Sequence, residues 1–166
     1  MIQLNFCVSI YLYSLHIWHC ISNSIFYTAA PYAMRISCGA RENVHTAPTN
    51  TLWYKDFAYT GGIPANATTP SFISPPKTLR YFPPSEGPEN CYIINRVPKG
   101  HYSVRVFFGL VNESSFDSEP LFDVSVEGTQ IYSLSSGWSN SDNEQVFAEA
   151  FLFLTDGMSK QLAATH

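Results

Sequence analysis

The sequence predicts an all-β protein of the β-sandwich type, related to jelly rolls. Residues 102–108 and 122–126 alternate apolar and polar side chains, which is typical of antiparallel strands with one face on a core. The chain is 15% aromatic, contains 11 Pro and is only 13% charged, which argues against disorder and against a long helical bundle. Short β-prone runs separated by Pro/Gly turns recur along most of the chain. Its 166 residues suit one domain.

The N-terminal residues form an apolar segment that predicts export. The first charged side chain is Arg35, and residues 4–21 are mostly apolar. Small residues at 28–30 suit signal-peptidase cleavage, so we expect residues 1–30 to be a secretory signal. The segment has no Lys or Arg in its n-region, and this leaves two alternatives, an uncleaved anchor and a misassigned start. A clean transmembrane helix is disfavoured, because polar residues would lie at mid-bilayer depth.

The rest of the sequence predicts strands that alternate with turns and loops. The Gly/Pro/Ser/Thr-rich segment 60–78 predicts an ordered surface loop. Helix and strand compete over residues 145–154, where Val and Phe favour strand. No strand is expected in residues 156–166, a divergent tail, so the domain looks truncated at this end with an unpaired strand edge. The other predicted strands are residues 34–38, 51–55, 79–82, 91–97 and 130–134.

Cysteine usage agrees with export. Loss of the signal would remove Cys7 and Cys20 and leave Cys38 and Cys91, an even number that predicts one disulfide. Closing a loop of about 50 residues would contribute roughly 3–4 kcal/mol. Two buried thiols are the alternative. Neither cysteine has a partner at metal-ligand spacing, so we expect no zinc site and no other cofactor.

Two sequons predict N-glycosylation of a secreted chain. They are Asn66-Ala67-Thr68 and Asn112-Glu113-Ser114, both in loop-like segments. We expect at least one of Asn66 and Asn112 to carry a glycan. A glycan at Asn112 would mark its loop as facing solvent.

The sequence does not predict an enzyme. Carboxylates for glycoside hydrolysis are present, but they fall in turn-like segments or on solvent faces, where solvated charge is the default. The histidines lack a Ser or Cys nucleophile motif, and no phosphate-binding glycine loop occurs. The net charge of -4, without a basic cluster, also argues against nucleic acid as a partner.

Four stretches together resemble a known family. They read "ISCGA", "LRYFP", "ENCYIINRVPKGHYSVRVFFGLVN" and "PLFDVSVEGTQI". Over residues 33–155 they are similar to the plant malectin-like, or di-glucose-binding, domain of receptor-like kinases and receptor-like proteins. The segment "TLWYKDFAYTGG" is most similar to that of receptor-like proteins that carry leucine-rich repeats after this domain. The resemblance implies a non-catalytic β-sandwich that binds carbohydrate through its loops.

The resemblance also implies which side chains would touch a sugar. In the animal malectin fold, aromatic rings stack on sugar C–H faces and a carboxylate accepts hydroxyl hydrogen bonds. Matching chemistry occurs in "WYKDFAY" and in the loop that follows residue 108, although aromatics at alternating positions of a β-prone stretch also suit a core. The resulting candidate ligand-binding residues are Trp53, Tyr54, Asp56, Tyr59, Phe116 and Asp117.

Two functions therefore compete, and each implies a partner. The first is a glycan-binding module for a glucose oligosaccharide or a cell-wall sugar, with weak or absent binding of glucose disaccharides expected from the loss of loop aromatics. The second is a receptor ectodomain that binds a peptide or co-receptor without sugar. An accessory domain of a glycan-processing enzyme is a distant third. All three place the chain in the secretory pathway, at the cell surface or outside the cell, with the endoplasmic reticulum also compatible. Membrane association would come only through a parent receptor or an uncleaved N-terminal segment.

Overall fold

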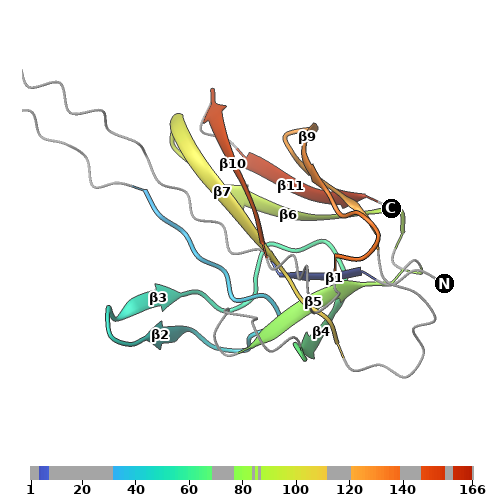
Figure 1. Cartoon of the computed structure of the whole chain (residues 1–166). Helices are drawn as coiled ribbons and strands as arrows, with labels where there is room; N and C mark the ends of the chain where they lie inside the picture. Colours follow the sequence, from blue (N-terminus) through green and yellow to red (C-terminus); the bar gives the residue numbers. More distant parts are fainter. Residues whose placement is uncertain are drawn as a thin grey trace, which may run out of the picture.

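The chain folds as a sandwich of two antiparallel sheets, with a small hairpin at one side (Figure 1). The computed structural model describes residues 4–7, 32–68, 77–83, 85, 87–111, 121–138, 147–155 and 159–165. No helix in these ranges is long and apolar enough to cross a membrane. The predicted all-β class is confirmed.

The first sheet has five strands in the order β10-β7-β1-β5-β4. All of its pairings are antiparallel. The longest strand pairing in this sheet is that of β7 with β10, with Phe147 opposite Phe107 at one end and Leu154 opposite Gly100 at the other. The strands are β1 (Leu4–Cys7), β4 (Ile63–Asn66), β5 (Thr78–Phe82), β7 (Gly100–Phe108) and β10 (Phe147–Leu154).

The second sheet has four strands in the order β6-β11-β8-β9, again antiparallel throughout. The hairpin of β2 and β3 extends away from both sheets (Figure 1). Strands of the second sheet are β6 (Glu89–Asn95), β8 (Asp123–Val126), β9 (Thr129–Ser133) and β11 (Ser159–Thr165); the hairpin strands are β2 (Val44–Thr46) and β3 (Thr51–Trp53).

The core lies between the two sheets and confirms the predicted core faces of β7 and β8. The predicted solvent face of β7 is wrong at Ser103, which is buried. In β7 the predicted core residues Tyr102, Val104, Val106 and Phe108 are buried, and in β8 Val124 and Val126 alternate with less buried neighbours. Phe107, on the opposite face of β7, is buried as well, because the Phe147 ring of β10 lies 6.0 Å from it. Burial of large aromatic and branched side chains of this kind is the dominant stabilising term in folding.

Three sequence-based assignments are wrong. Residues 34–38 form no strand; Ile36 makes only an isolated parallel bridge to Tyr54. The loop predicted over 60–78 contains β4, whose Pro64 is tolerated because β4 is an edge strand. The predicted tail contains β11, which pairs with β6 on one side and β8 on the other. Its Ala163 and Ala164 carry little β-propensity, so only pairing on both sides and burial identify the strand.

The predicted secretory signal overlaps the first sheet. Leu4–Cys7 is strand β1, and it pairs with both β5 and β7. The cleavage of residues 1–30 stays a prediction, as does the alternative of an uncleaved anchor. The remainder of this segment lies outside the described residues.

Candidate functional site

A buried ion pair organises the loops beside β4 and β5. Arg80 Nε donates to Asp56 Oδ2 at 2.7 Å, and the two side chains are only 6% and 5% exposed. Asp56 also accepts hydrogen bonds from the Gly39 amide at 2.7 Å and from the Tyr92 hydroxyl at 3.0 Å. A buried carboxylate with three donors has its charge compensated, so Asp56 has a structural role.

Arg80 extends the same network to the segment that leads into β4. Its Nη1 donates to the carbonyl oxygens of Gly61 and Gly62. The guanidinium carbon lies 3.4 Å from the centroid of the Tyr59 ring, which is a cation–π contact. Because Arg80 belongs to the first sheet and Tyr92 to the second, this network joins the two layers next to the loops.

Two glycines allow the loops to approach β5 closely. Gly39 has φ +77, and a Cβ at this residue would meet the Leu79 carbonyl oxygen at 2.4 Å. Gly62 has φ +84, and a Cβ there would meet the Phe82 ring at 2.5 Å. Only glycine suits both the backbone conformation and the space. The Gly39 turn thereby places residues 40–42 next to β4.

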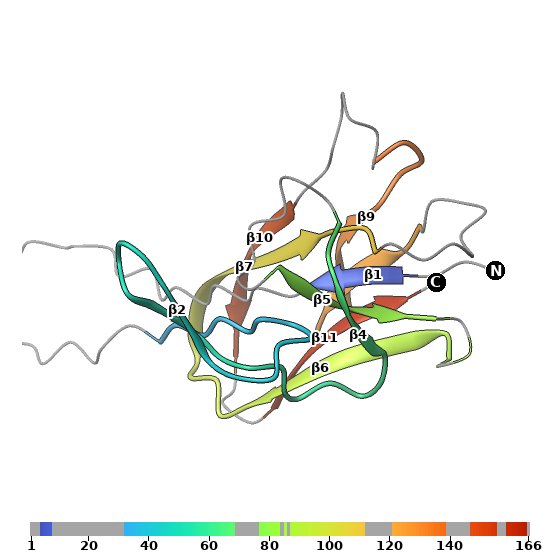
Figure 2. The same cartoon turned by 90° about the horizontal axis from the view of Figure 1, so that it is seen from below.

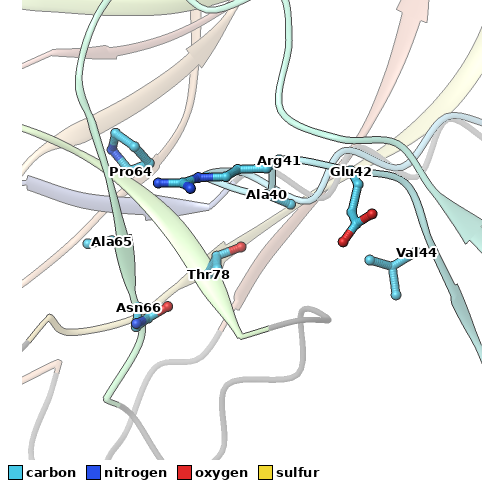
Figure 3. Close-up of a pocket in the computed structure, with 9 residues that line it drawn as sticks. Ala40, Arg41, Glu42, Val44, Pro64, Ala65, Asn66 and Thr78 are labelled. Atoms are coloured by element: carbon cyan, nitrogen blue, oxygen red, sulfur yellow. The ribbon is translucent and has the colours of Figure 1, made fainter.

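A pocket of about 450 Å³ lies between this turn, the hairpin, β4 and the first residue of β5 (Figure 3). Arg41 extends across it towards Pro64, and Glu42 lies on the side of Val44 (Figure 3). The volume is in the range that small ligands occupy. The lining residues are Gly39, Ala40, Arg41, Glu42, Val44, Pro64, Ala65, Asn66 and Thr78.

Thr78 gives this pocket a polar group that no other described residue uses. Its Oγ1 is buried and has no hydrogen-bond partner among the described residues. Buried hydroxyl groups are nearly always hydrogen-bonded, because an unpaired one costs free energy. Figure 3 shows the hydroxyl on the side of the pocket that faces Ala40 and Glu42. The pocket therefore offers a hydroxyl, a carboxylate, a guanidinium and the Asn66 amide.

The four candidate residues that the structure describes do not form an aromatic sugar platform among themselves. Trp53 is buried in the core, and Asp56 is held in the ion pair. Tyr54 is 37% exposed and packs edge-on against Phe57. Tyr59 is 44% exposed, but one face lies under the Arg80 guanidinium. Phe116 and Asp117 lie outside the described residues. The sequence reasoning missed Arg41, Glu42 and Thr78, since nothing in their local pattern marks them as neighbours.

The structure describes only one of the two sequon asparagines, Asn66. Asn66 is exposed on the edge strand β4 and lines the pocket. Thr68, the third residue of its sequon, donates its hydroxyl to the Leu110 carbonyl oxygen at 3.1 Å. Asn112 lies outside the described residues. Glycosylation at both sites stays a prediction.

The predicted Cys38–Cys91 disulfide is not formed in the structure, where both cysteines are buried. Cys91 belongs to β6, and its Sγ donates to Glu89 Oε1 at 3.2 Å and accepts from Gln161 Nε2 at 2.9 Å. Burial is the main cause that raises the pKa of the Cys91 thiol, which disfavours the reactive thiolate. Pairing in an oxidising compartment stays a prediction.

Comparison with known proteins identifies the class of this domain. The family model for the malectin-like domain matches residues 36–161, which is most of the chain, and the chain belongs to this family. Receptor-like protein 4 of Arabidopsis thaliana is 74% identical over 129 residues, which cover 77% of this chain and 20% of that protein. The chain thus spans about a fifth of the length of this relative. No solved structure matches.

Proposed function

We propose that this domain is a non-catalytic recognition module of a plant cell-surface receptor-like protein, and that it binds carbohydrate in the pocket beside Thr78. The Thr78 hydroxyl, which is buried and has no hydrogen-bond partner among the described residues, carries the proposal. A ligand hydroxyl can pair with it, whereas an apolar ligand would leave it unsatisfied. The family and the Arabidopsis relative support an ectodomain, outside the cell or at its surface.

The charged residues of the pocket suit sugar hydroxyl groups. Glu42 accepts hydrogen bonds, Arg41 donates them, and the Asn66 amide does both. Hydrogen bonds to charged groups are the stronger ones. None of the described residues that line the pocket is aromatic, and none of them can therefore supply the stacking that strengthens sugar binding. We therefore expect glucose disaccharides to bind with a Kd weaker than about 1 mM.

A titration followed by amide NMR tests this site. Glucose disaccharides and cell-wall oligosaccharides are added to the full chain and to a Thr78→Val variant. We expect shifts that centre on residues 39–42 and on β4 in the wild type, and at least a several-fold weaker response in Thr78→Val. Arg41→Gln should also weaken binding, while Lys55→Gln, at an exposed position outside the pocket, should not. Shifts that centre elsewhere, or an unchanged response in Thr78→Val, would rule the pocket out.

A second candidate function, binding of a protein partner, rests on β10. Its outward side chains Phe147, Phe151 and Phe153 are exposed, Phe151 to 69%. Cationic or polar groups border these rings. The Arg105 guanidinium carbon lies 5.0 Å from the centroid of the Phe147 ring. The Phe153 ring centroid lies 5.9 Å from Lys99 Nζ and 4.7 Å from the centroid of the His101 ring. Aromatic residues with Arg are typical of protein interfaces.

Photo-crosslinking separates the two functions. A photoreactive amino acid at position 151 should attach to one defined protein at the plant cell surface if β10 is an interface. The same amino acid at position 41 should attach to none. Sugar-dependent shifts at the pocket without crosslinks from position 151 would leave only the carbohydrate function.

A further inference from the structure

Strand β1 lies in the interior of the first sheet rather than at its edge. It runs antiparallel to β5, with Leu4 opposite Phe82 and Phe6 opposite Arg80. On its other side it runs antiparallel to β7, with Phe6 opposite Phe108 and Cys7 opposite Phe107. Figures 1 and 2 show β1 flanked by these two strands. In the spatial strand order β10-β7-β1-β5-β4, β5 and β7 are not paired with each other, because β1 lies between them.

The parts of β5 and β7 that lie next to β1 are covered on both faces. In β5 the consecutive residues Leu79, Arg80, Tyr81 and Phe82 are all buried, and in β7 Phe107 and Phe108 are both almost inaccessible. Successive side chains of a strand point to opposite faces, so consecutive burial means that neither face is open to solvent. Water therefore cannot easily replace a missing strand at this place.

Without β1, the space between β5 and β7, called the slot below, would be empty. An empty slot would lower the stability of the fold, because backbone groups of β5 and β7 would lose their partners. Each buried backbone N–H or C=O left unpaired costs about 1–3 kcal/mol. The slot also adjoins the ion pair of the candidate site, because Phe6 of β1 is in register with Arg80 of β5. An unfilled slot would loosen the strand that holds Asp56.

We propose that the space between β5 and β7 is a strand-acceptor site and that Leu4–Cys7 is the donor strand that fills it. The N-terminal segment is then a structural part of the folded domain. The binding mode is β-strand addition on two sides at once, in which main-chain hydrogen bonds supply affinity. A donor of this kind also binds when it is supplied as a separate peptide.

The first test uses the full chain with Phe6→Pro, refolded from denaturant so that export has no influence. Proline removes a ladder hydrogen bond from a strand paired on both sides. We expect a lower Tm than wild type and at least tenfold faster hydrogen exchange in β5 and β7. Leu12→Pro, outside β1, is the matched control and should leave both measurements near wild type. An unchanged Tm with unchanged exchange in the Phe6→Pro variant would overturn the proposal.

The second test supplies the donor in trans. A synthetic peptide of residues 1–12 is added to the Phe6→Pro chain, during refolding if that chain does not fold alone. We expect slow exchange in β5 and β7 to return and the Tm to rise with peptide concentration, as for any ligand of the native state. The same peptide carrying proline at position 6 should have no effect. No recovery with the wild-type peptide, or equal recovery with both peptides, would show that the slot is not an acceptor for this strand.

A third measurement decides whether Leu4–Cys7 is the occupant in the cell. Mass spectrometry of the protein from plant tissue should find a chain that retains residues 4–7. A mature chain that begins after residue 7 and is nevertheless protected in β5 and β7 would mean that another strand fills the slot. That result would overturn β1 as the donor.

Discussion

Asp56 shows how the setting of a single residue decides its role. Its position within "WYKDFAY" suggested a carboxylate for a sugar, yet Arg80, Gly39 and Tyr92 use its oxygen atoms inside the fold. Asp56 instead positions the Gly39 turn. Its backbone amide also donates a hydrogen bond to the Ala40 carbonyl oxygen in this turn. Thr78, by contrast, lines the pocket that adjoins this turn.

Removal of the Asp56 carboxylate should destabilise the domain severely. In Asp56→Ala the Arg80 charge would stay buried without its partner, at a cost of about 3–5 kcal/mol. Urea unfolding measures this loss. The matched control is Glu149→Ala, which breaks the more exposed Arg105–Glu149 pair and should cost about 1 kcal/mol or less. Equal losses in the two variants would contradict a structural role for Asp56.

Glu149 should give the domain a small pH dependence in the acidic range. Hydrogen bonds from Ser103, and then from Arg105, hold the pKa of Glu149 below its usual value of 4.5. A lowered pKa in the folded state stabilises the protein above pH 4.5, and this stabilisation is lost as the pH falls through the folded-state pKa. The difference in unfolding free energy between wild type and Glu149→Gln should follow this course in urea titrations. A difference that grows on acidification would contradict the assignment.

Asn66 should carry a glycan when the chain passes through the secretory pathway. It is exposed on an edge strand and lines the pocket. Intact mass measurement of secreted protein should show the loss of one glycan in Asn66→Gln, and Thr68→Ala should have the same effect. Asn112→Gln serves as the comparison. Identical masses for wild type and Asn66→Gln, after allowance for the substitution, would show that Asn66 is unmodified.

At the scale of elements, pairing partners override weak local signals. β11 follows a segment that suggested the end of the fold, but its residues fill the gap between β6 and β8, with Ala163 opposite Cys91 and Ser125. β4 behaves similarly, since β5 holds a Pro-containing segment as an edge strand. Local propensity spans only about 1 kcal/mol per residue in sheets, so long-range hydrogen bonds and burial decide such cases.

Deletion of residues 156–166 should therefore disrupt the second sheet. The deletion removes β11 and exposes the edges of β6 and β8 together with the core around Ala164, which is fully buried. We expect the shortened chain to lose its cooperative thermal transition and to be cut rapidly by protease. Removal of His166 alone is the control and should change neither. A shortened chain as resistant as wild type would show that β11 is dispensable.

At the scale of the whole molecule, two sheets and a shared core hold the loops of the candidate site at one side. The segment from Asp56 to Gly62 joins the layers: Ile93 of β6 donates its amide to the Ala58 carbonyl oxygen at 2.7 Å, while Arg80 of β5 binds Gly61 and Gly62. A malectin-like domain of this kind presents loops on a rigid scaffold, which is the usual arrangement of binding sites on β-sandwiches.

The sequence by itself determined the all-β class, the family and the strands with clear alternation, above all β7 and β8. The all-β class and these strands follow from local periodicity, because one buried face imposes a period of two on the side chains. The family follows instead from the four sequence stretches that resemble it. Only the tertiary structure decided the pairing of β11, the insertion of β1, the burial of Trp53 and the role of Asp56. The same is true of the pocket, which unites the residues after Gly39 with β4 and Thr78 across long stretches of sequence. Such contacts depend on which strands become neighbours, and no local pattern specifies that choice.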